Sequence, residues 1–293
     1  MAERLPSARR LLRWGEARLA RAGIGPALQE AEWLLSHVAN RTRIHLYLDD
    51  GFITRAFIQA YGRLVNRRYH GEPLQYLTGE TEFFGRRFRV QPGVFIPRPE
   101  TESIVAAVLD ELRRLGRTAQ ALRVVEGGTG SGCMAVTLAS ELPACQVVAT
   151  DVSYLALTVA RSNAQAHGVE RRVFFVQGRW NEPLRMRADV CVSNPPYIPS
   201  DEVNRLPRDV QHEPRASLDG GADGTRDLLQ LLREGPERLV AGGILALECA
   251  EEQVAVLQEE AQAIAAFDAI QPVHDLAGRP RGLVLLLGNR EKA

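Results

Sequence analysis

The sequence predicts an α/β fold in which a doubly wound, mostly parallel sheet of seven strands follows a small helical bundle and a β-hairpin. Three patterns support this prediction. Apolar residues recur at helical spacing through the first 75 residues. Aromatic and β-branched residues then flank Gly85, which indicates a hairpin. From Leu122 onward, short apolar segments alternate with amphipathic ones, which is typical of a parallel sheet covered by helices.

These patterns divide the chain into three expected regions: a helical domain over residues 1–75, a hairpin linker over 76–93 and the main domain over 94–293. Because no amphipathic segment separates the last two strands, we expect them to form an antiparallel hairpin at one end of the sheet. Ligands of such sheets lie outside the carboxyl ends of the strands, so functional residues are expected there. The candidate strands are Leu122–Glu126, Gln146–Thr150, Arg172–Gln177, Ala188–Ser193, Gly243–Glu248, Phe267–Val273 and Gly282–Leu287.

The composition argues against several classes of function. With 36 basic and 36 acidic residues the formal net charge is zero, so bulk attraction to nucleic acid is not expected. No apolar run reaches the ~20 residues needed to span a membrane, and Arg9, Arg10 and Arg13 interrupt the N-terminus where a signal peptide is apolar. Four scattered cysteines without a C-x-x-C spacing predict reduced core residues. The expected protein is cytoplasmic and monomeric, with no metal site and no direct contact with membrane or nucleic acid.

The helical region is more basic than the remainder, with twelve arginines against seven acidic residues over residues 1–75. An arginine-rich helical surface is compatible with plain solvation. It is also compatible with the docking of an acidic partner. Both interpretations remain open.

The segment Ser193–Tyr197, which reads Ser-Asn-Pro-Pro-Tyr, follows an apolar run typical of a buried strand. Its two prolines lack an N–H group and fix φ at about −65°, so neither a strand nor a helix continues through it. An amide or amino nitrogen is a poor nucleophile because its lone pair is delocalised. The Asn194 side-chain oxygen and the Pro195 carbonyl can accept two N–H groups of such a nitrogen, while the Tyr197 ring covers its face. The alternative is a strand end followed by a stiff loop.

A glycine-rich loop, Gly127–Gly132, follows the first candidate strand and opens a helix. Its register is G-x-G-x-G, which fails the dinucleotide pattern, and no lysine follows as in a P-loop. Asp151 ends the second strand, where a carboxylate can accept both hydroxyls of a ribose. The arrangement predicts a nucleoside site without a pyrophosphate, although a tight turn with a helix-capping Asp151 is also possible. Trp180 can flank an adenine or belong to the core.

Taken together, these features resemble the class I S-adenosylmethionine-dependent methyltransferases, which have a Rossmann-like fold. Among them, the chain is similar over nearly its whole length to the family that methylates the glutamine side-chain amide of peptide chain release factors. The motifs that carry the resemblance are Pro73–Gly79, Ile96–Glu102, Gly128–Gly132, Asn194–Ile198, Glu213-Pro214 with Leu218 and Gly220–Gly224, and Gly278–Arg281.

The resemblance implies a function and a set of roles. The substrate is the glutamine nitrogen N5 in the Gly-Gly-Gln motif of peptide chain release factors, and its methylation modulates translation termination. The implied catalytic residues are Asn194, Pro195 and Tyr197, and Pro196 joins them in substrate binding. The implied S-adenosylmethionine site consists of Glu126, Gly128, Thr129, Gly130, Ser131, Gly132, Asp151, Trp180 and Asn194.

The chain departs from the family pattern at several positions. Glu126-Gly127 stands where an aspartate and a bulky apolar residue are usual, and a glycine there costs about 0.5–1 kcal/mol of local stability. Arg179 replaces a usual acidic residue and cannot accept a hydrogen bond from the adenine amino group. Ala250 replaces a usual glycine. These changes predict weaker cofactor binding.

Two other functions compete with this one. An amino methyltransferase acting on adenine in nucleic acid shares the Asn-Pro-Pro-Tyr motif, but it requires a target-reading insertion and a basic cleft, neither of which the sequence indicates. A weakly active or non-catalytic paralogue that binds a release factor is compatible with Gly127 and Arg179.

Overall fold

The computed structural model describes residues 5–48 and 53–289, which divide into two compact units. Unit 1 contains the chain up to Glu80 together with Pro207–His212, and unit 2 contains Thr81–Leu206 and the chain from Glu213 onward. Across the described ranges, no helix is both long and apolar enough to cross a membrane.

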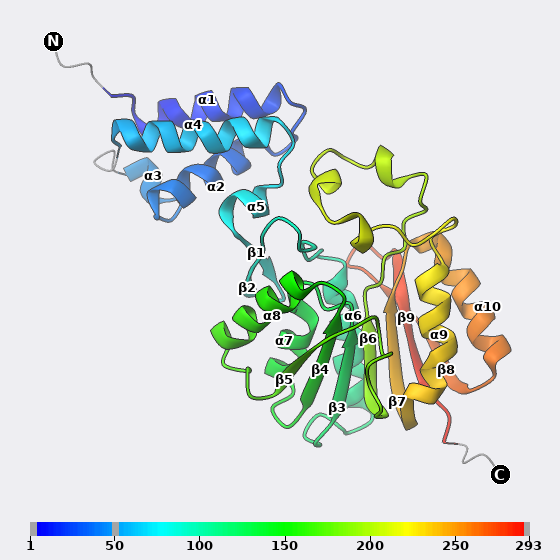
Figure 1. Cartoon of the computed structure of the whole chain (residues 1–293). Helices are drawn as coiled ribbons and strands as arrows, with labels where there is room; N and C mark the ends of the chain where they lie inside the picture. The colour runs from blue at the N-terminus through cyan, green and yellow to red at the C-terminus, as the bar shows by residue number, and fades with distance from the viewer. Residues whose placement is uncertain (1–4, 49–52, 290–293) are drawn as a thin grey trace. The chain divides into compact units, whose positions relative to one another are not determined.

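Unit 1 is helical, as the sequence predicts (Figure 1). Its core is formed by apolar residues that recur on one side of each long helix, such as Leu34, Tyr61 and Val65, which are fully buried. The Ser7 and Thr54 hydroxyls accept N–H groups at the starts of the first and fourth helices. The elements are α1 (Ala8–Ala20), α2 (Ala27–Ala39), α3 (His45–Leu48), α4 (Arg55–Tyr69), α5 (Leu74–Thr78) and the 3-10 turn η2 (Val210–His212).

A buried ion pair ties the short segment Pro207–His212 into unit 1. Arg68, 7% exposed, donates to both carboxylate oxygens of Glu30 at 2.6 and 3.1 Å and to Asp209 Oδ2 at 3.3 Å. An uncompensated charge at this depth would be costly, so the segment and the helices depend on one another.

The hairpin consists of β1 (Glu80–Phe83) and β2 (Arg86–Arg89). Phe84 and Gly85 form its two-residue turn with φ of 52° and 68°, as a tight hairpin requires. Phe83 and Phe88 are fully buried in the main core of unit 2. The hairpin therefore contributes to the packing of unit 2 and does more than connect two regions.

Unit 2 contains the expected seven-stranded sheet, in the order β5-β4-β3-β6-β7-β9-β8. The first five of these strands are parallel, and β9 is antiparallel to both of its neighbours. The predicted antiparallel hairpin at one end is confirmed, with β9 inserted between β7 and β8. The strands are β3 (Arg123–Gly127), β4 (Gln146–Asp151), β5 (Val173–Gln177), β6 (Ala188–Ser193), β7 (Leu239–Glu248), β8 (Phe267–His274) and β9 (Pro280–Leu287).

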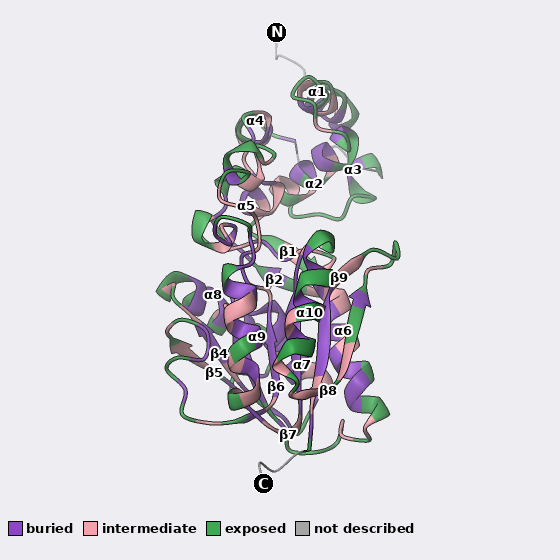
Figure 2. Ribbon diagram, turned by 90° about the vertical axis from the view of Figure 1, so that its right-hand side faces the viewer, coloured by how far each residue is buried: buried purple, intermediate pink, exposed green. Residues whose placement is uncertain are grey.

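Helices cover both faces of this sheet, because successive strand residues point to opposite sides. Val124 belongs to the apolar cluster shared with α6, α7 and α8, and Val125 belongs to the cluster shared with α9 and α10. Figure 2 shows the resulting buried interior of the strands. The helices are α6 (Thr101–Arg114), α7 (Cys133–Glu141), α8 (Tyr154–Ala166), α9 (Arg226–Arg238) and α10 (Val254–Ile264), with 3-10 turns η1 (Val203–Arg205), η3 (Arg215–Ser217) and η4 (Glu251–Gln253).

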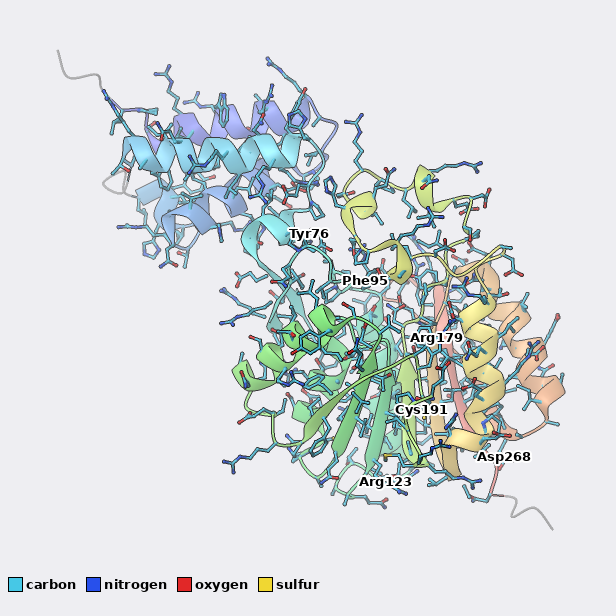
Figure 3. The ribbon with its side chains drawn as sticks, in the orientation of Figure 1. Tyr76, Phe95, Arg123, Arg179, Cys191 and Asp268 are labelled. Atoms are coloured by element: carbon cyan, nitrogen blue, oxygen red, sulfur yellow. The ribbon has the colours of Figure 1, made fainter. Side chains whose placement is uncertain are left out.

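The strand order reverses between β3 and β6, and this creates a crevice at their carboxyl ends. Residues Arg179 and Phe95, labelled in Figure 3, lie toward this edge, whereas Arg123 begins β3 at the opposite edge. The candidate site lies in this crevice.

Candidate active site

The glycine-rich loop after β3 lines a cavity of about 350 Å³ in unit 2. Gly128 and Gly130 have φ of 74° and 55°, which glycine adopts without strain. The Gly128 N–H donates to the Thr150 carbonyl at 2.9 Å and holds the loop against β4. Gly132 serves packing, because an added Cβ would lie 2.9 Å from the Ala160 side chain of α8. The loop residues on the cavity wall are Gly128, Thr129, Gly130 and Ser131.

Glu126, near the end of β3, also lines the cavity and is 1% exposed. Its Oε2 accepts the Thr129 hydroxyl at 2.6 Å and the Ala135 N–H at 3.0 Å. Its Oε1 has no hydrogen-bond partner in the described part of the chain. Burial raises the pKa of Glu126 to about 8, against the two hydrogen bonds that lower it. A buried carboxylate with a free oxygen matches a cationic group entering from the cavity.

Asp151, the last residue of β4, is held by two backbone N–H groups. Its Oδ2 accepts from Gly130 at 2.9 Å and its Oδ1 accepts from Ser153 at 2.8 Å. Burial raises its pKa, while these two hydrogen bonds lower it. Each oxygen keeps a further lone pair, so the carboxylate can accept two adjacent hydroxyls.

Trp180 belongs both to the core and to the cavity wall. Its backbone has φ of 45°, and the Thr150 hydroxyl donates to its carbonyl at 2.7 Å. An added Cβ at Gly127 would lie 3.2 Å from the Trp180 ring, and one at Gly128 would lie 2.9 Å from it. The unusual Gly127 therefore leaves room for the Trp180 ring, which occupies the space of a larger residue.

The unusual Arg179 pairs with a carboxylate that the sequence did not assign to the site. Arg179 Nη2 lies 2.5 Å from Asp227 Oδ1, and Arg226 Nη2 lies 2.8 Å from Asp227 Oδ2. All three residues line the cavity. Asp227 thus brings two carboxylate oxygens to the cavity wall, each paired with one of the two arginines, and the weaker cofactor binding expected from Arg179 stays a prediction.

The four residues Asn194–Tyr197 follow β6, but they do not share one environment. Asn194 and Pro196 line the cavity, and Pro195 is buried and is not among the lining residues. The Tyr197 ring packs against the apolar cluster under α9, and its hydroxyl donates to Glu248 Oε1 at 3.4 Å.

The segment Gly220–Gly224 packs against the backbone of the loop that follows β6. The Gly220 N–H donates to the Ile198 carbonyl at 2.9 Å. An added Cβ at Gly224 would lie 2.2 Å from the Tyr197 carbonyl oxygen, so no larger residue fits there. The Gln253 side chain donates to the same oxygen at 2.9 Å. These contacts explain why a glycine-rich segment far along the chain accompanies the Asn-Pro-Pro-Tyr motif.

Glu213 connects the proline-rich segment before α6 to the segment that follows Pro207–His212. Glu213, 6% exposed, accepts the Ile96 N–H at 2.9 Å and pairs with the Arg98 guanidinium. Phe95 and Pro214, beside these tethered residues, both line the cavity. The two segments therefore build one wall.

Sequence reasoning missed two buried residues beside Asn194. Asn194 Nδ2 donates to the Thr101 hydroxyl, at the start of α6, at 3.2 Å. Glu248 ends β7, is 1% exposed, and has a pKa raised to about 7 by burial. Its place at the carboxyl end of a strand next to β6 is the signal that would have identified it.

The cavity thus combines three features of use in group transfer. Glu126 offers a free oxygen for a cation, Asp151 offers acceptors for two hydroxyls, and Asn194 offers an amide on the wall of the same cavity. Within the described residues, no cluster of three or more His, Cys, Asp or Glu side chains is arranged to hold a metal ion.

Models of two known protein domains match residues in both units of the chain. A model of the PrmC N-terminal domain matches residues 10–79, and a model of the methyltransferase small domain matches residues 86–211. Among solved structures, the hMettl16 catalytic domain in complex with MAT2A 3′UTR hairpin 6 is 14% identical, with a TM-score of 0.55 over 79% of this chain and 93% of that chain. A methyltransferase from Pyrococcus furiosus is 20% identical, with a TM-score of 0.50 over 70% of this chain and 90% of that chain. Both likenesses show the methyltransferase fold.

Curated relatives extend the similarity over nearly the whole chain. The release factor glutamine methyltransferase of Moorella thermoacetica is 41% identical over 91% of this chain and 94% of its own length. That of Geobacter sulfurreducens is 42% identical over 82% of this chain and 83% of its own length. This chain therefore belongs to the release factor glutamine methyltransferase family.

Proposed function

We propose that this protein transfers a methyl group from S-adenosylmethionine to the side-chain amide nitrogen N5 of the glutamine in the Gly-Gly-Gln motif of peptide chain release factors. Family membership supports the reaction and its substrate class. The observation that carries the proposal is the position of Asn194, whose amide lines the cavity beside the glycine-rich loop. An amide acceptor at this point is suited to an N–H substrate.

The residues of the cavity fit the cofactor. The Glu126 Oε1, which has no hydrogen-bond partner among the described residues, can pair with the ammonium of the cofactor's methionine portion. The Asp151 carboxylate can accept the hydroxyls of the cofactor's ribose. Trp180 and the Arg179–Asp227 pair lie on the wall available to the adenine. When bound, S-adenosylmethionine supplies an electrophilic methyl group on a sulfonium.

The chain's own contribution to the reaction is orientation. The Asn194 Oδ1 and the Pro195 carbonyl accept the two N–H groups of the glutamine amide and turn its nitrogen toward the methyl group. They also stabilise the positive charge that develops on that nitrogen. No strong base is required before transfer, because the excess proton leaves afterwards.

Unit 1 serves recognition of the whole release factor. Its helices contain no candidate catalytic group, and α1 exposes Arg10 and Arg13, one helical turn apart. An acidic surface on the partner would match them, with a steep dependence on salt.

The proposal is tested by incubating the purified protein with S-adenosylmethionine and a recombinant release factor, followed by mass spectrometry of its Gly-Gly-Gln peptide. We expect the glutamine to gain one methyl group. A release factor with Gln→Ala in this motif, duplex DNA and RNA are the controls, and we expect no methyl transfer to any of them. Methylation of nucleic acid without methylation of the release factor would contradict the proposal.

A further inference from the structure

The peptide unit between Ser131 and Gly132 ends the glycine-rich loop and leads into α7. Its N–H donates to the Thr129 carbonyl at 2.8 Å. Gly132 has φ of 82°, and a glycine has no side chain that would restrict rotation of this peptide. A second contact, on the Ser131 carbonyl, is therefore needed to keep the loop in one shape before a ligand binds.

Asn163, in α8, supplies that contact. It is 1% exposed, and its Nδ2 donates to the Ser131 carbonyl at 2.8 Å. The C=O and N–H of a trans peptide point in opposite directions, so Asn163 and Thr129 hold the same peptide from its two sides. Ala160, one helical turn before Asn163, lies where an added Cβ at Gly132 would approach it to 2.9 Å. One face of α8 therefore meets both residues of this peptide.

The hairpin fixes which end of the Asn163 amide faces the loop. The Arg89 N–H, at the end of β2, donates to Asn163 Oδ1 at 2.8 Å, and the Arg89 carbonyl accepts from Nδ2 at 3.0 Å. A backbone N–H only donates and a carbonyl only accepts, so the reversed amide would lose all three of its hydrogen bonds. The amide is thus held with its donors toward Ser131.

We propose that Asn163 is a positioning residue for cofactor binding, which uses the end of β2 as an anchor to hold the Ser131–Gly132 peptide of the glycine-rich loop. This inference rests on the proposed function and gives the hairpin a role in the cofactor site. Neither Asn163 nor Arg89 is among the described residues that line the cavity, so both act through the loop.

The expected effect is on affinity more than on turnover. Without the amide, the carbonyl of Ser131, which is 2% exposed, loses its partner, and the loop must be ordered when S-adenosylmethionine binds. The same loop holds the ribose acceptor, because the Gly130 N–H donates to Asp151 Oδ2. Once the cofactor is bound, the loop is ordered and the methyl transfer itself is little changed.

Two variants of the full chain remove the contact in different ways. Asn163→Ala removes all three hydrogen bonds. Asn163→Asp keeps the shape and an acceptor for the Arg89 N–H, but it places a carboxylate oxygen against the Ser131 carbonyl. By isothermal titration with S-adenosylmethionine at pH 8, we expect the Kd to rise at least about tenfold in both. The kcat on release factor at saturating cofactor should stay within about twofold of wild type.

Two neighbours of Asn163 in α8 provide matched controls. Ser162→Ala removes the hydroxyl that accepts from Arg89 Nη1 at 2.9 Å, so it breaks a side-chain link between the same helix and hairpin. Ala164→Gly weakens the same helix at a residue of the apolar core. Both should bind the cofactor with a Kd within about twofold of wild type.

Hydrogen exchange without cofactor gives a reading of the loop itself. By mass spectrometry, the segment Gly128–Gly132 should exchange about tenfold faster in Asn163→Ala than in wild type, and at the wild-type rate in Ser162→Ala. This measurement is independent of both cofactor binding and activity.

An unchanged Kd in folded Asn163→Ala and Asn163→Asp, or an equal rise in Ala164→Gly, would overturn the inference. Circular dichroism of each variant confirms folding, and either Asn163 variant gives the reading if the other is unstable. If wild type itself binds no S-adenosylmethionine, the proposed function fails instead, and hydrogen exchange of the loop still decides whether Asn163 holds it.

Discussion

Asp227 Oδ1 lies 2.5 Å from Arg179 Nη2 at the wall of the cavity, where the aspartate side chain is 1% exposed and the arginine side chain 45% exposed. Arg226 pairs with the second oxygen of the same carboxylate. The buried negative charge is thus balanced by two half-exposed cations. An arginine at position 179, which looks unfavourable beside an adenine site, is explained by the need to neutralise Asp227.

This pairing predicts the effect of charge reversal at position 179. Arg179→Asp places a second carboxylate beside Asp227, so the cofactor Kd should rise about tenfold, with like-charge repulsion weakened by solvent. Arg179→Gln removes the charge without reversing it and should change the Kd about threefold at most. Isothermal titration measures both values. Tighter binding by Arg179→Asp would mean that Asp227 is not the relevant neighbour.

The pKa of Glu126 predicts how cofactor binding depends on pH. The carboxylic acid must lose its proton to pair with an ammonium, and its pKa of about 8 places this loss near neutral pH. The association constant should therefore rise with pH between about 6 and 8, by up to about tenfold per pH unit. Titrations at pH 6, 7 and 8 measure the slope. Glu126→Gln should bind more weakly at pH 8 and show little slope.

The same group predicts the opposite trend for stability without cofactor. Its pKa is higher in the folded state than the ordinary value of 4.5, so the folded state binds more protons between these two values. The contribution of Glu126 to the free energy of unfolding should fall as pH rises through this window. Thermal unfolding of wild type and Glu126→Gln at pH 5.5 and 8 isolates this contribution. If wild type loses no more stability than Glu126→Gln between pH 5.5 and 8, the Glu126 carboxylate is already ionised in the folded state at pH 5.5.

Gly127 and Trp180 should be energetically coupled. Gly127→Val adds atoms where an added Cβ already lies 3.2 Å from the Trp180 ring, so we expect a loss of about 1–3 kcal/mol. Trp180→Leu vacates this space, and adding Gly127→Val to it should cost much less. Chemical denaturation of the four proteins completes the cycle. Equal costs in the two backgrounds would argue that Gly127 has no packing role.

The exposed arginines of α1 should contribute to recognition of the whole release factor. Arg10→Glu with Arg13→Glu should raise KM for release factor about tenfold at low salt and leave kcat on a short Gly-Gly-Gln peptide unchanged. Steady-state assays at two salt concentrations measure the effect. If the double variant and wild type have the same KM for whole release factor, Arg10 and Arg13 belong to the solvated face of the helix and play no part in recognition.

The local patterns of the sequence predict much of the sheet and part of the site. The glycine-rich loop, Asp151 and Asn194 each follow an apolar strand, and parallel strands bring their carboxyl ends to one edge. The insertion of β9 between β7 and β8 also has a sequence basis. Three successive residues of β9, Leu283–Leu285, are buried as in a central strand, whereas Val273 is the buried residue of β8, and Asp268 (Figure 3) lies at a break in its register with β9.

The residues that sequence reasoning missed depend on contacts between distant parts of the chain. Thr101 meets Asn194 because the start of α6 lies near the end of β6, and Asp227, at the start of α9, meets Arg179 on the cavity wall. No periodicity or motif in a single sequence encodes such pairings. A departure such as Gly127 is likewise understood only once the Trp180 ring is seen beside it.

The central claim is that Asn194 orients the substrate amide, and the kcat of Asn194→Ala on a Gly-Gly-Gln substrate tests it most directly. Asn66→Ala, on the exposed side of α4, is the matched control and should retain wild-type kcat. Because one of two acceptors is removed, kcat of Asn194→Ala should fall by about 10²–10³. A kcat near that of wild type in a folded Asn194→Ala protein would contradict the account.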